Sequence, residues 1–164
     1  MKRVLFVCIE NAGRSQMAEA FANHYGKGRV VAESAGTVPA NEVNPTVVKV
    51  MKEKGLDVSR NRPALMDLER AKNADLVVTM GCSVEEVCPA PLLRHAVDWG
   101  LEDPKGKPIE KVREIRDEIE RRVQELLSNL QGEKWTSSPR WTRSSSDRIG
   151  LVERGLALLA NGAR

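Results

Sequence analysis

The sequence predicts an α/β fold of three layers, in which helices cover both faces of a four-stranded parallel sheet. Three observations support this expectation. Short apolar runs alternate along the chain with longer segments of helical periodicity. The first run, at 2–8, is continuously apolar after its two leading charged residues, which is typical of a parallel strand that is buried on both faces. A chain of 164 residues, of which 41% are hydrophobic and 30% charged, is long enough to bury such a sheet.

The first half of the chain supplies two strands and two helices in alternation. Apolar residues at helical spacing over 15–25 predict a helix directly after the first strand, and the segment 29–34, which Ala35 and Gly36 close, predicts a second strand. A second helix is expected to begin at Pro45 and to be stopped by Gly55. Proline suits the first turn of a helix, and glycine suits its end.

The middle of the chain predicts one more helix and two more strands. Pro63 is expected to open a helix that carries Leu65 and Leu68 on its apolar face. Residues 75–80 predict a third buried strand, and residues 95–99 predict a short fourth one. Strands that alternate with helices in this way favour parallel pairing, because each crossover helix returns the chain to the same end of the sheet.

The last predicted helix begins near Pro108 and is amphipathic. Asp98 and Glu102, which precede it, are interpreted as surface or helix-capping acids, and Trp99 as a packing residue. The apolar residues of the helix recur every three or four positions and predict one buried face: Ile109, Val112, Ile115, Ile119, Val123 and Leu126. The charged residues predict a solvated face, which includes Glu110, Lys111, Arg113, Glu114 and Arg116.

Charge and composition divide the chain at Gln131. Residues 1–131 contain equal numbers of basic and acidic residues, whereas residues 132–164 contribute the whole net charge of +3. The segment 135–148 is rich in Ser, Thr and Arg, and helical spacing resumes over 149–160. We therefore predict a domain at 1–131, followed by a mobile tail that consists of a linker and a short C-terminal helix.

Composition also limits the classes of function. A net charge of +3 gives no case for a nucleic-acid partner, and no apolar run approaches the roughly 18 residues that a membrane span needs. The N-terminal apolar run has no small-residue cleavage site, so we interpret it as a strand rather than a signal peptide. Three cysteines are an odd number, which favours reduced working thiols over a disulfide framework. We expect a cytoplasmic monomer.

Cys8 and Arg14 flank a loop that joins the first strand to the first helix, in the sequence C-I-E-N-A-G-R-S. The N–H groups of this loop can turn to one centre, to which the helix N-terminus adds partial positive charge. Arg14 can bind two oxygens of a tetrahedral anion, and Ser15 can hydrogen-bond to a Cys8 thiolate that this field favours. We expect Glu10 to turn its side chain to solvent. The predicted oxyanion-binding residues are Glu10, Asn11, Ala12, Gly13, Arg14 and Ser15; the alternative is a buried structural cysteine beside a surface arginine.

The residues around this loop resemble a known family. V-C-I-E-N-A-G-R-S-Q-M-A-E-A at 7–20 is similar to the signature of the low-molecular-weight protein tyrosine phosphatases, whose topology is flavodoxin-like or Rossmann-like. Gln16 and Met17 resemble the arsenate reductase branch of this family, since the phosphatases more often have proline at the position of Gln16. Further matches are E-S-A-G-T at 33–37, N-P at 44–45, A-D-L-V-V-T-M at 74–80 and D-W-G-L-E-D-P-K-G-K at 98–107.

Cys82 and Cys88 follow the third strand in the sequence M-G-C-S-V-E-E-V-C-P. Because the carboxyl ends of parallel strands meet at one edge of a sheet, both thiols are expected near Cys8. Three thiols near one site can pass an oxidation along by exchange. Two alternatives stay open: a pair of inert buried cysteines, or a metal site. The five-residue gap and the absence of a histidine at ligand spacing argue against the metal site.

The resemblance implies roles for these residues in a thioredoxin-coupled arsenate reductase. Cys8 would attack arsenic and form a thiol–arsenate adduct, and Cys82 would then attack the sulfur of Cys8 and release arsenite. Cys88 would attack Cys82, and thioredoxin would reduce the Cys82–Cys88 disulfide. Asp103, which Pro104 restricts to extended geometry, matches the Asp-Pro pair of the family and would act as the general acid.

The resemblance also implies a weak potassium site near Asn11, Glu19 and Ser34, at which Ala64 replaces an expected acid. No tightly bound cofactor is expected. The leading hypothesis is an arsenate reductase that takes arsenate or a phosphate-like oxyanion, with thioredoxin as reductant. The alternative is a low-molecular-weight phosphatase that hydrolyses phosphomonoesters through a phosphocysteine intermediate, although the segment 100–110 holds no Phe or Tyr to flank a phenol ring. A non-enzymatic sensor of arsenic or redox state is a third hypothesis.

Overall fold

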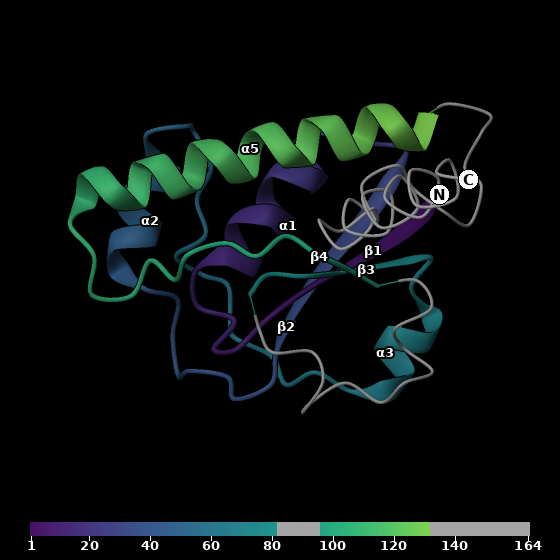
Figure 1. The fold of residues 1–164 in the computed structure, drawn as a ribbon, viewed down its shortest axis with the longest axis horizontal. Coiled ribbons are helices and arrows are strands. Elements are labelled where there is room, and N and C mark those ends of the chain that lie inside the picture. Colours follow the sequence, from purple (N-terminus) through teal and green to yellow (C-terminus); the bar gives the residue numbers. More distant parts are fainter. Residues whose placement is uncertain (82–95, 132–164) are drawn as a thin grey trace, which may run out of the picture. The chain divides into compact units, whose positions relative to one another are not determined.

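A computed structural model describes residues 1–81 and 96–131, over which strands and helices alternate (Figure 1). Cys82, Cys88 and the predicted tail at 132–164 lie outside the described residues. The strands are β1 (Lys2–Cys8), β2 (Val30–Gly36), β3 (Leu76–Thr79) and β4 (Ala96–Asp98), and the helices are α1 (Arg14–Tyr25), α2 (Pro45–Lys52), α3 (Leu68–Asn73) and α5 (Ile109–Gln131). The domain boundary and the tail therefore stay predictions.

The predicted parallel sheet of four strands is confirmed. Its strand order is β2-β1-β3-β4, and every neighbouring pair is parallel. The register places Cys8 beside Gly36, and Val7 lies beside Thr79 on the other side. The carboxyl ends of β1, β2 and β3 therefore meet at one edge, which is where open α/β sheets bind ligands.

Helices cover both faces of the sheet, as the three-layer prediction requires. Helix α1 packs against β1, β2 and the long helix α5, which also contacts α2, whereas α3 lies apart from these helices and packs on β1 (Figure 1). Successive side chains of a strand point to opposite faces, so alternate residues of β1 face the two layers. One buried cluster joins the strands to α3 and consists of Leu5, Val7, Ala35, Ala71 and Val77.

The apolar stripe of α5 is confirmed, and so is the packing role of Trp99. Five of the six predicted α5 positions are buried, and Ile109 in the first turn is half-buried. The Trp99 ring is 9% exposed and lies 5.7 Å from the Phe6 ring, centroid to centroid. The helix that was expected to run from Pro45 to Gly55 ends at Lys52.

The helix that was predicted to open at Pro63 begins only at Leu68, so that prediction is wrong about its start. Leu65 forms a β-bridge with Gly36: the Gly36 N–H donates to Ala64 O and the Met66 N–H donates to Gly36 O, each at 2.8 Å. These bonds use backbone groups that a helical turn would need. The Leu65 side chain, which was expected on the apolar face of the helix, is 62% exposed.

The helix starts after this bridge because Asp67 caps it. The Asp67 carboxylate accepts the backbone N–H of Arg70 at 2.8 Å, which satisfies one of the free donors of the first turn. Pro63 therefore does not start the helix, whereas Asp67, four residues later, does.

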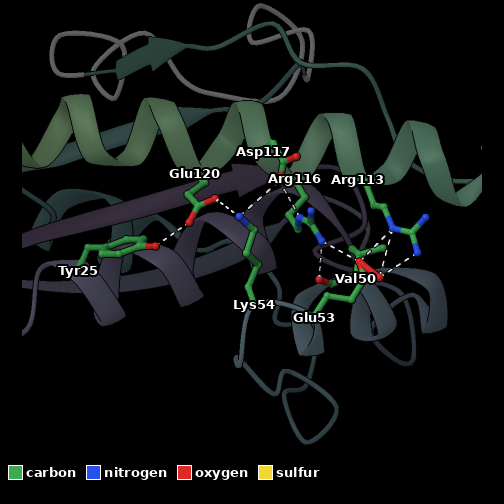
Figure 2. Close-up of polar contacts among 8 residues, drawn as sticks. All are labelled: Tyr25, Val50, Glu53, Lys54, Arg113, Arg116, Asp117 and Glu120. Atoms are coloured by element: carbon green, nitrogen blue, oxygen red, sulfur yellow. Dashed lines mark hydrogen bonds and ion pairs between the residues drawn. The ribbon is translucent and has the colours of Figure 1, made fainter.

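Arg116 is not part of a solvated face, so that prediction is wrong too. It is 7% exposed and donates from Nη1 to Val50 O at 2.9 Å and to Glu53 Oε1 at 2.8 Å (Figure 2). Val50 lies near the end of α2, where carbonyl groups lack partners within the helix. Arg116 supplies the missing donor and fastens α2 to α5.

A second set of contacts continues along α5. Lys54 Nζ lies 2.8 Å from Glu120 Oε2, and the Tyr25 hydroxyl donates to Glu120 Oε1 at 2.6 Å (Figure 2). That hydrogen bond raises the pKa of Tyr25 above its ordinary value. Within the described ranges, no helix combines the length and the apolar character that crossing a membrane requires.

Candidate active site

Cys8 ends β1 at the ligand-binding edge of the sheet and is 2% exposed. The Asn11 N–H donates to its sulfur at 3.2 Å, and Ser15 Oγ lies 2.8 Å from the same sulfur. Asn11 Nδ2 donates to Ser15 Oγ at 2.7 Å, so the hydroxyl hydrogen of Ser15 is free to point at the sulfur. Two donors thus converge on Cys8, an arrangement that stabilises a thiolate.

A buried network of amide side chains holds the loop in this shape. Asn11 has φ of 51°, a left-handed conformation that asparagine tolerates better than most residues. Its Oδ1 accepts the Ala64 N–H at 2.9 Å and lies 3.3 Å from the Gln16 Nε2 donor. Gln16 Oε1 in turn accepts from Asn61 Nδ2 at 2.9 Å. The sequence identified Gln16 only as a family marker, and its role as a support for the loop was missed.

Arg14 is 4% exposed and lies between the loop and the strand ends. Its Nη1 donates to Met80 O, which follows β3, and to Leu101 O at 2.8 Å. Its Nη2 lies 3.5 Å from Asp103 Oδ2. One nitrogen of the guanidinium is therefore anchored to the backbone, and the other is directed to the acid.

Asp103 stands at the side of the pocket and is held there by its own loop. Its Oδ1 accepts the Lys105 N–H at 2.9 Å, and the side chain is 48% exposed. Pro104 packs on Gly13, because a Cβ at residue 13 would lie 2.8 Å from Pro104 Cγ. Gly13 thus permits the acid loop to approach the cysteine loop closely.

Glu10 does not turn freely to solvent as we expected. Its Oε1 lies 2.6 Å from Lys105 Nζ, and its side chain is 33% exposed. This hydrogen bond raises the pKa of Lys105 above its ordinary value. Glu10 therefore faces the acid loop across the pocket instead of pointing away from it.

These residues enclose one small pocket of about 20 Å³, which is the space of one or two water molecules. Six predicted site residues line it together, and Ser15 Oγ lies 2.8 Å from the cysteine sulfur. The six are Cys8, Glu10, Ala12, Gly13, Arg14 and Asp103. Three lining residues were not predicted, namely Asn44, Pro104 and Lys105, although Pro104 belongs to the Asp-Pro pair. None of the described lining residues is aromatic: they are Cys8, Glu10, Ala12, Gly13, Arg14, Asn44, Asp103, Pro104 and Lys105.

Gly81 is the last described residue before Cys82, and it contacts the site. It has φ of +78°, and a Cβ there would lie 2.8 Å from Arg14 Nη1. Asp98 Oδ1 accepts the Gly81 N–H and the Thr79 hydroxyl, both at 3.0 Å. Asp98 is exposed at the surface, as expected, but it does not cap a helix: its carboxylate holds the chain in place as it leaves β3.

A second pocket, of about 250 Å³, lies behind the loop and is lined by Glu19, Ser34 and six other residues. The Ser34 hydroxyl donates to Glu19 Oε2, and burial raises the pKa of Glu19 above its ordinary value. Asn11 is not among the lining residues, and its side-chain Oδ1 already accepts from the Ala64 N–H and from Gln16 Nε2. In the described part of the chain, no group of three or more His, Cys, Asp or Glu side chains is arranged to hold a metal ion.

Comparisons with known proteins identify the family. The profile of the low molecular weight phosphotyrosine protein phosphatases matches residues 3–136. A relative from Halobacterium salinarum with an arsenate reductase name is 44% identical over 130 residues, 76% of this chain and 90% of the relative. The "Glutaredoxin arsenate reductase" of Synechocystis is 35% identical over 133 residues, which cover 79% of this chain and 99% of the relative.

Solved structures of arsenate reductases and of a phosphatase are also similar to this chain. "An arsenate reductase in the phosphate binding state" has a TM-score of 0.71 and 35% identity, over 80% of this chain and 100% of that one. A thioredoxin-dependent arsenate reductase from Corynebacterium glutamicum has a TM-score of 0.69 and 38% identity, over 80% of this chain and 62% of that one. An arginine phosphatase from Geobacillus stearothermophilus has a TM-score of 0.71 and 29% identity, over 80% and 94%.

Proposed function

Because this chain belongs to the low molecular weight phosphotyrosine protein phosphatase family, we propose that it reduces arsenate to arsenite with Cys8 as the nucleophile. The observation that carries the proposal is the convergence of donors on the Cys8 sulfur, inside a pocket that Arg14 and Asp103 also line. Relatives with arsenate reductase names support the choice of arsenate among tetrahedral oxyanions.

The first step forms a bond between sulfur and arsenic. The Cys8 thiolate attacks As(V), and a hydroxyl group of arsenate takes a proton from Asp103 and leaves as water. Arg14 and the N–H groups of the loop hold the remaining oxygens, since a guanidinium and a helix N-terminus both favour negative charge. Ser15 stabilises the sulfur through its hydroxyl, and arsenic is still As(V) in the resulting adduct.

The second step transfers two electrons to arsenic. The Cys82 thiolate attacks the Cys8 sulfur, the electron pair of the S–As bond passes to arsenic, and arsenite leaves as As(III). A Cys8–Cys82 disulfide remains. Cys88 then attacks Cys82, which restores the Cys8 thiolate and forms a Cys82–Cys88 disulfide. An external dithiol reduces that disulfide and closes the cycle.

We assign thioredoxin as the external dithiol. The chain carries two cysteines beyond Cys8, which is what a disulfide that is passed within the protein and then to a dithiol partner requires. A thioredoxin-dependent relative at 38% identity and a relative with glutaredoxin in its name both support a thiol-based reductant. The cytoplasm, where thiols are kept reduced, is the compartment that such a cycle needs.

A weak potassium site remains part of the proposal, although only part of the expected ligand set fits. Glu19 and Ser34 line one pocket and supply oxygen ligands of the kind that hard cations prefer. Asn11 Oδ1 is already used by the Ala64 N–H, and Ala64 has no side-chain oxygen. No step of the reduction depends on this ion.

The experiment measures arsenate-dependent NADPH oxidation with thioredoxin and thioredoxin reductase, beside p-nitrophenyl phosphate hydrolysis by the same sample. We expect sustained NADPH consumption for the wild-type protein. Cys82→Ser should abolish multiple turnovers of arsenate and keep the hydrolysis of the aryl phosphate, since hydrolysis uses Cys8, Arg14 and Asp103. Sustained arsenate reduction by Cys82→Ser would contradict the relay.

A phosphomonoesterase is the second candidate. The family and the arginine phosphatase relative favour it, and the cysteine, arginine and aspartate of the pocket suffice for the chemistry. The absence of aromatic side chains among the described lining residues speaks against a site for phosphotyrosine. Ester hydrolysis without arsenate-dependent NADPH loss would favour this candidate, and absence of both reactions would favour a sensor.

A further inference from the structure

An ion pair bridges the two walls of the pocket. Lys105 Nζ lies 2.6 Å from Glu10 Oε1, although the two residues are 95 positions apart in the sequence. Glu10 belongs to the loop after β1, and Lys105 belongs to the loop that carries Asp103. Both line the pocket that contains Cys8. The contact therefore joins the cysteine loop to the acid loop beside the reacting sulfur.

The pair contributes little to the stability of the fold. The Lys105 side chain is 66% exposed and that of Glu10 is 33% exposed, and ion pairs at such exposure have small effects on unfolding. Its effect is local, because the acid loop is already tied to the cysteine loop by Arg14–Asp103 and by Pro104 on Gly13. The ion pair adds a third contact between the two loops, and its lysine is more exposed than Arg14, Asp103 or Glu10.

Free oxyanions and phosphomonoesters differ in whether part of the ligand must extend past the Glu10–Lys105 ion pair. A free oxyanion has four oxygens and nothing further, so it can lie wholly within the loop. A phosphomonoester carries an organic group that must extend from the pocket between its walls, and the pocket is only about 20 Å³.

We propose that the Glu10–Lys105 pair is a specificity determinant, which favours a free tetrahedral oxyanion over a phosphomonoester by closing the mouth through which the organic group would extend. The inference rests on the proposed function, because it explains why this site would take arsenate in preference to an ester.

The pair also offsets a repulsion at the site. An unpaired Glu10 carboxylate beside a bound dianion would weaken binding, and the Lys105 ammonium neutralises it. The hydrogen bond to Glu10 raises the pKa of Lys105 above its ordinary value, so the pairing favours the charged ammonium. This charge effect acts on both kinds of ligand. A test of whether the ion pair excludes the organic group must therefore compare two ligands of equal charge.

The test is equilibrium binding of inorganic phosphate and of phenylphosphonate, measured by calorimetry at pH 8.5 on the full chain. Both ligands are dianions at this pH, and the C–P bond of phenylphosphonate is not hydrolysed. We expect the wild-type protein to prefer phosphate. In Lys105→Ala the preference, taken as the ratio of the two Kd values, should fall at least about fivefold, a change equivalent to about 1 kcal/mol.

Lys107→Ala is the matched control. It removes the same charge from the same loop, but Lys107 pairs with Glu102 at 3.0 Å rather than with the cysteine loop. The preference of Lys107→Ala for phosphate over phenylphosphonate should stay within twofold of the wild-type value. The double variant Glu10→Lys/Lys105→Glu exchanges the partners and should recover the preference that Glu10→Lys alone loses.

Two outcomes would overturn the inference. One is an unchanged ratio in Lys105→Ala, which includes an equal weakening of both ligands, and the other is a fall in the ratio that Lys107→Ala reproduces. The measurement is independent of turnover. A protein that shows the fivefold change but no arsenate-dependent NADPH oxidation would refute the proposed function and leave the specificity inference intact.

Discussion

Gly81 lies directly against the guanidinium of Arg14: a Cβ at residue 81 would stand 2.8 Å from Arg14 Nη1 and equally close to Leu101 O. Leu101 O is itself a hydrogen-bond acceptor for that Nη1. The backbone that leads from β3 toward Cys82 therefore passes beside the group that is proposed to clamp the oxyanion. Because Gly81 has no Cβ, the backbone at this residue can lie directly beside the Arg14 guanidinium.

Gly81→Ala should disturb the position of Arg14. The new methyl group meets Nη1, and an L-residue at φ of +78° adds strain of about 1–2 kcal/mol. We expect the KM for p-nitrophenyl phosphate to rise about tenfold. Gly28→Ala is the control, because Gly28 has φ of +80° and nothing lies within 4 Å of its Cβ position. Equal KM values for both variants would contradict the role of the contact.

Asp103→Asn tests the general acid. Loss of proton donation should lower the kcat for p-nitrophenyl phosphate by about 10²-fold or more. An ester with a better leaving group, such as 2,4-dinitrophenyl phosphate, should be affected less, because its oxygen needs no proton to depart.

Glu102→Gln is the comparison for this variant. It removes the neighbouring acid, which pairs with Lys107 and Lys111 at the surface. We expect its kcat to stay within twofold of the wild-type value. An Asp103→Asn variant with equal losses for both esters would argue against proton donation as the role of this carboxyl.

Glu19→Gln should change the pH dependence of stability. Burial raises the pKa of Glu19, so the folded state favours its neutral form. Below the unfolded pKa the carboxyl is neutral in both states, whereas above the folded pKa the folded state carries a desolvated charge that costs stability. The variant should therefore melt a few degrees higher than wild type near pH 7, and this difference should vanish near pH 4.

Thermal unfolding in potassium chloride and in sodium chloride extends this test. If Glu19 and Ser34 hold potassium, the wild-type protein should be stabilised by potassium near pH 7, and Glu19→Gln should lose that effect. A wild-type protein with the same melting temperature in both salts would refute the weak potassium site.

Arg116→Met should destabilise the fold. It removes the donor to Val50 O and leaves a carbonyl at the end of α2 without its partner, which costs about 1–3 kcal/mol in unfolding free energy measured in urea. Arg113→Met removes an exposed contact to the same Glu53 and should cost clearly less. Similar losses in both variants would show that the pairing with Glu53, rather than the bond to Val50 O, carries the effect.

Local sequence patterns were sufficient for most of the fold. The apolar run of β1, the helical spacing of α1 and the stripe of α5 are properties of neighbouring residues, and burial of one face follows from them. The start of α3 could not be found in this way. The bridge between Leu65 and Gly36 competes with the helical turn, and these two residues lie far apart in the sequence.

The sequence by itself determined the parallel sheet, the loop between Cys8 and Arg14, and the family to which it belongs, since each depends on residues that are close along the chain. Only the tertiary structure decided what lies around that loop. Arg14 meets Leu101 O, Asp98 fastens Gly81, and Glu10 meets Lys105, all across distant segments. The physical reason is that the parallel sheet brings its strand ends to one edge, where short-range polar contacts form between loops whose spacing along the chain carries no signal.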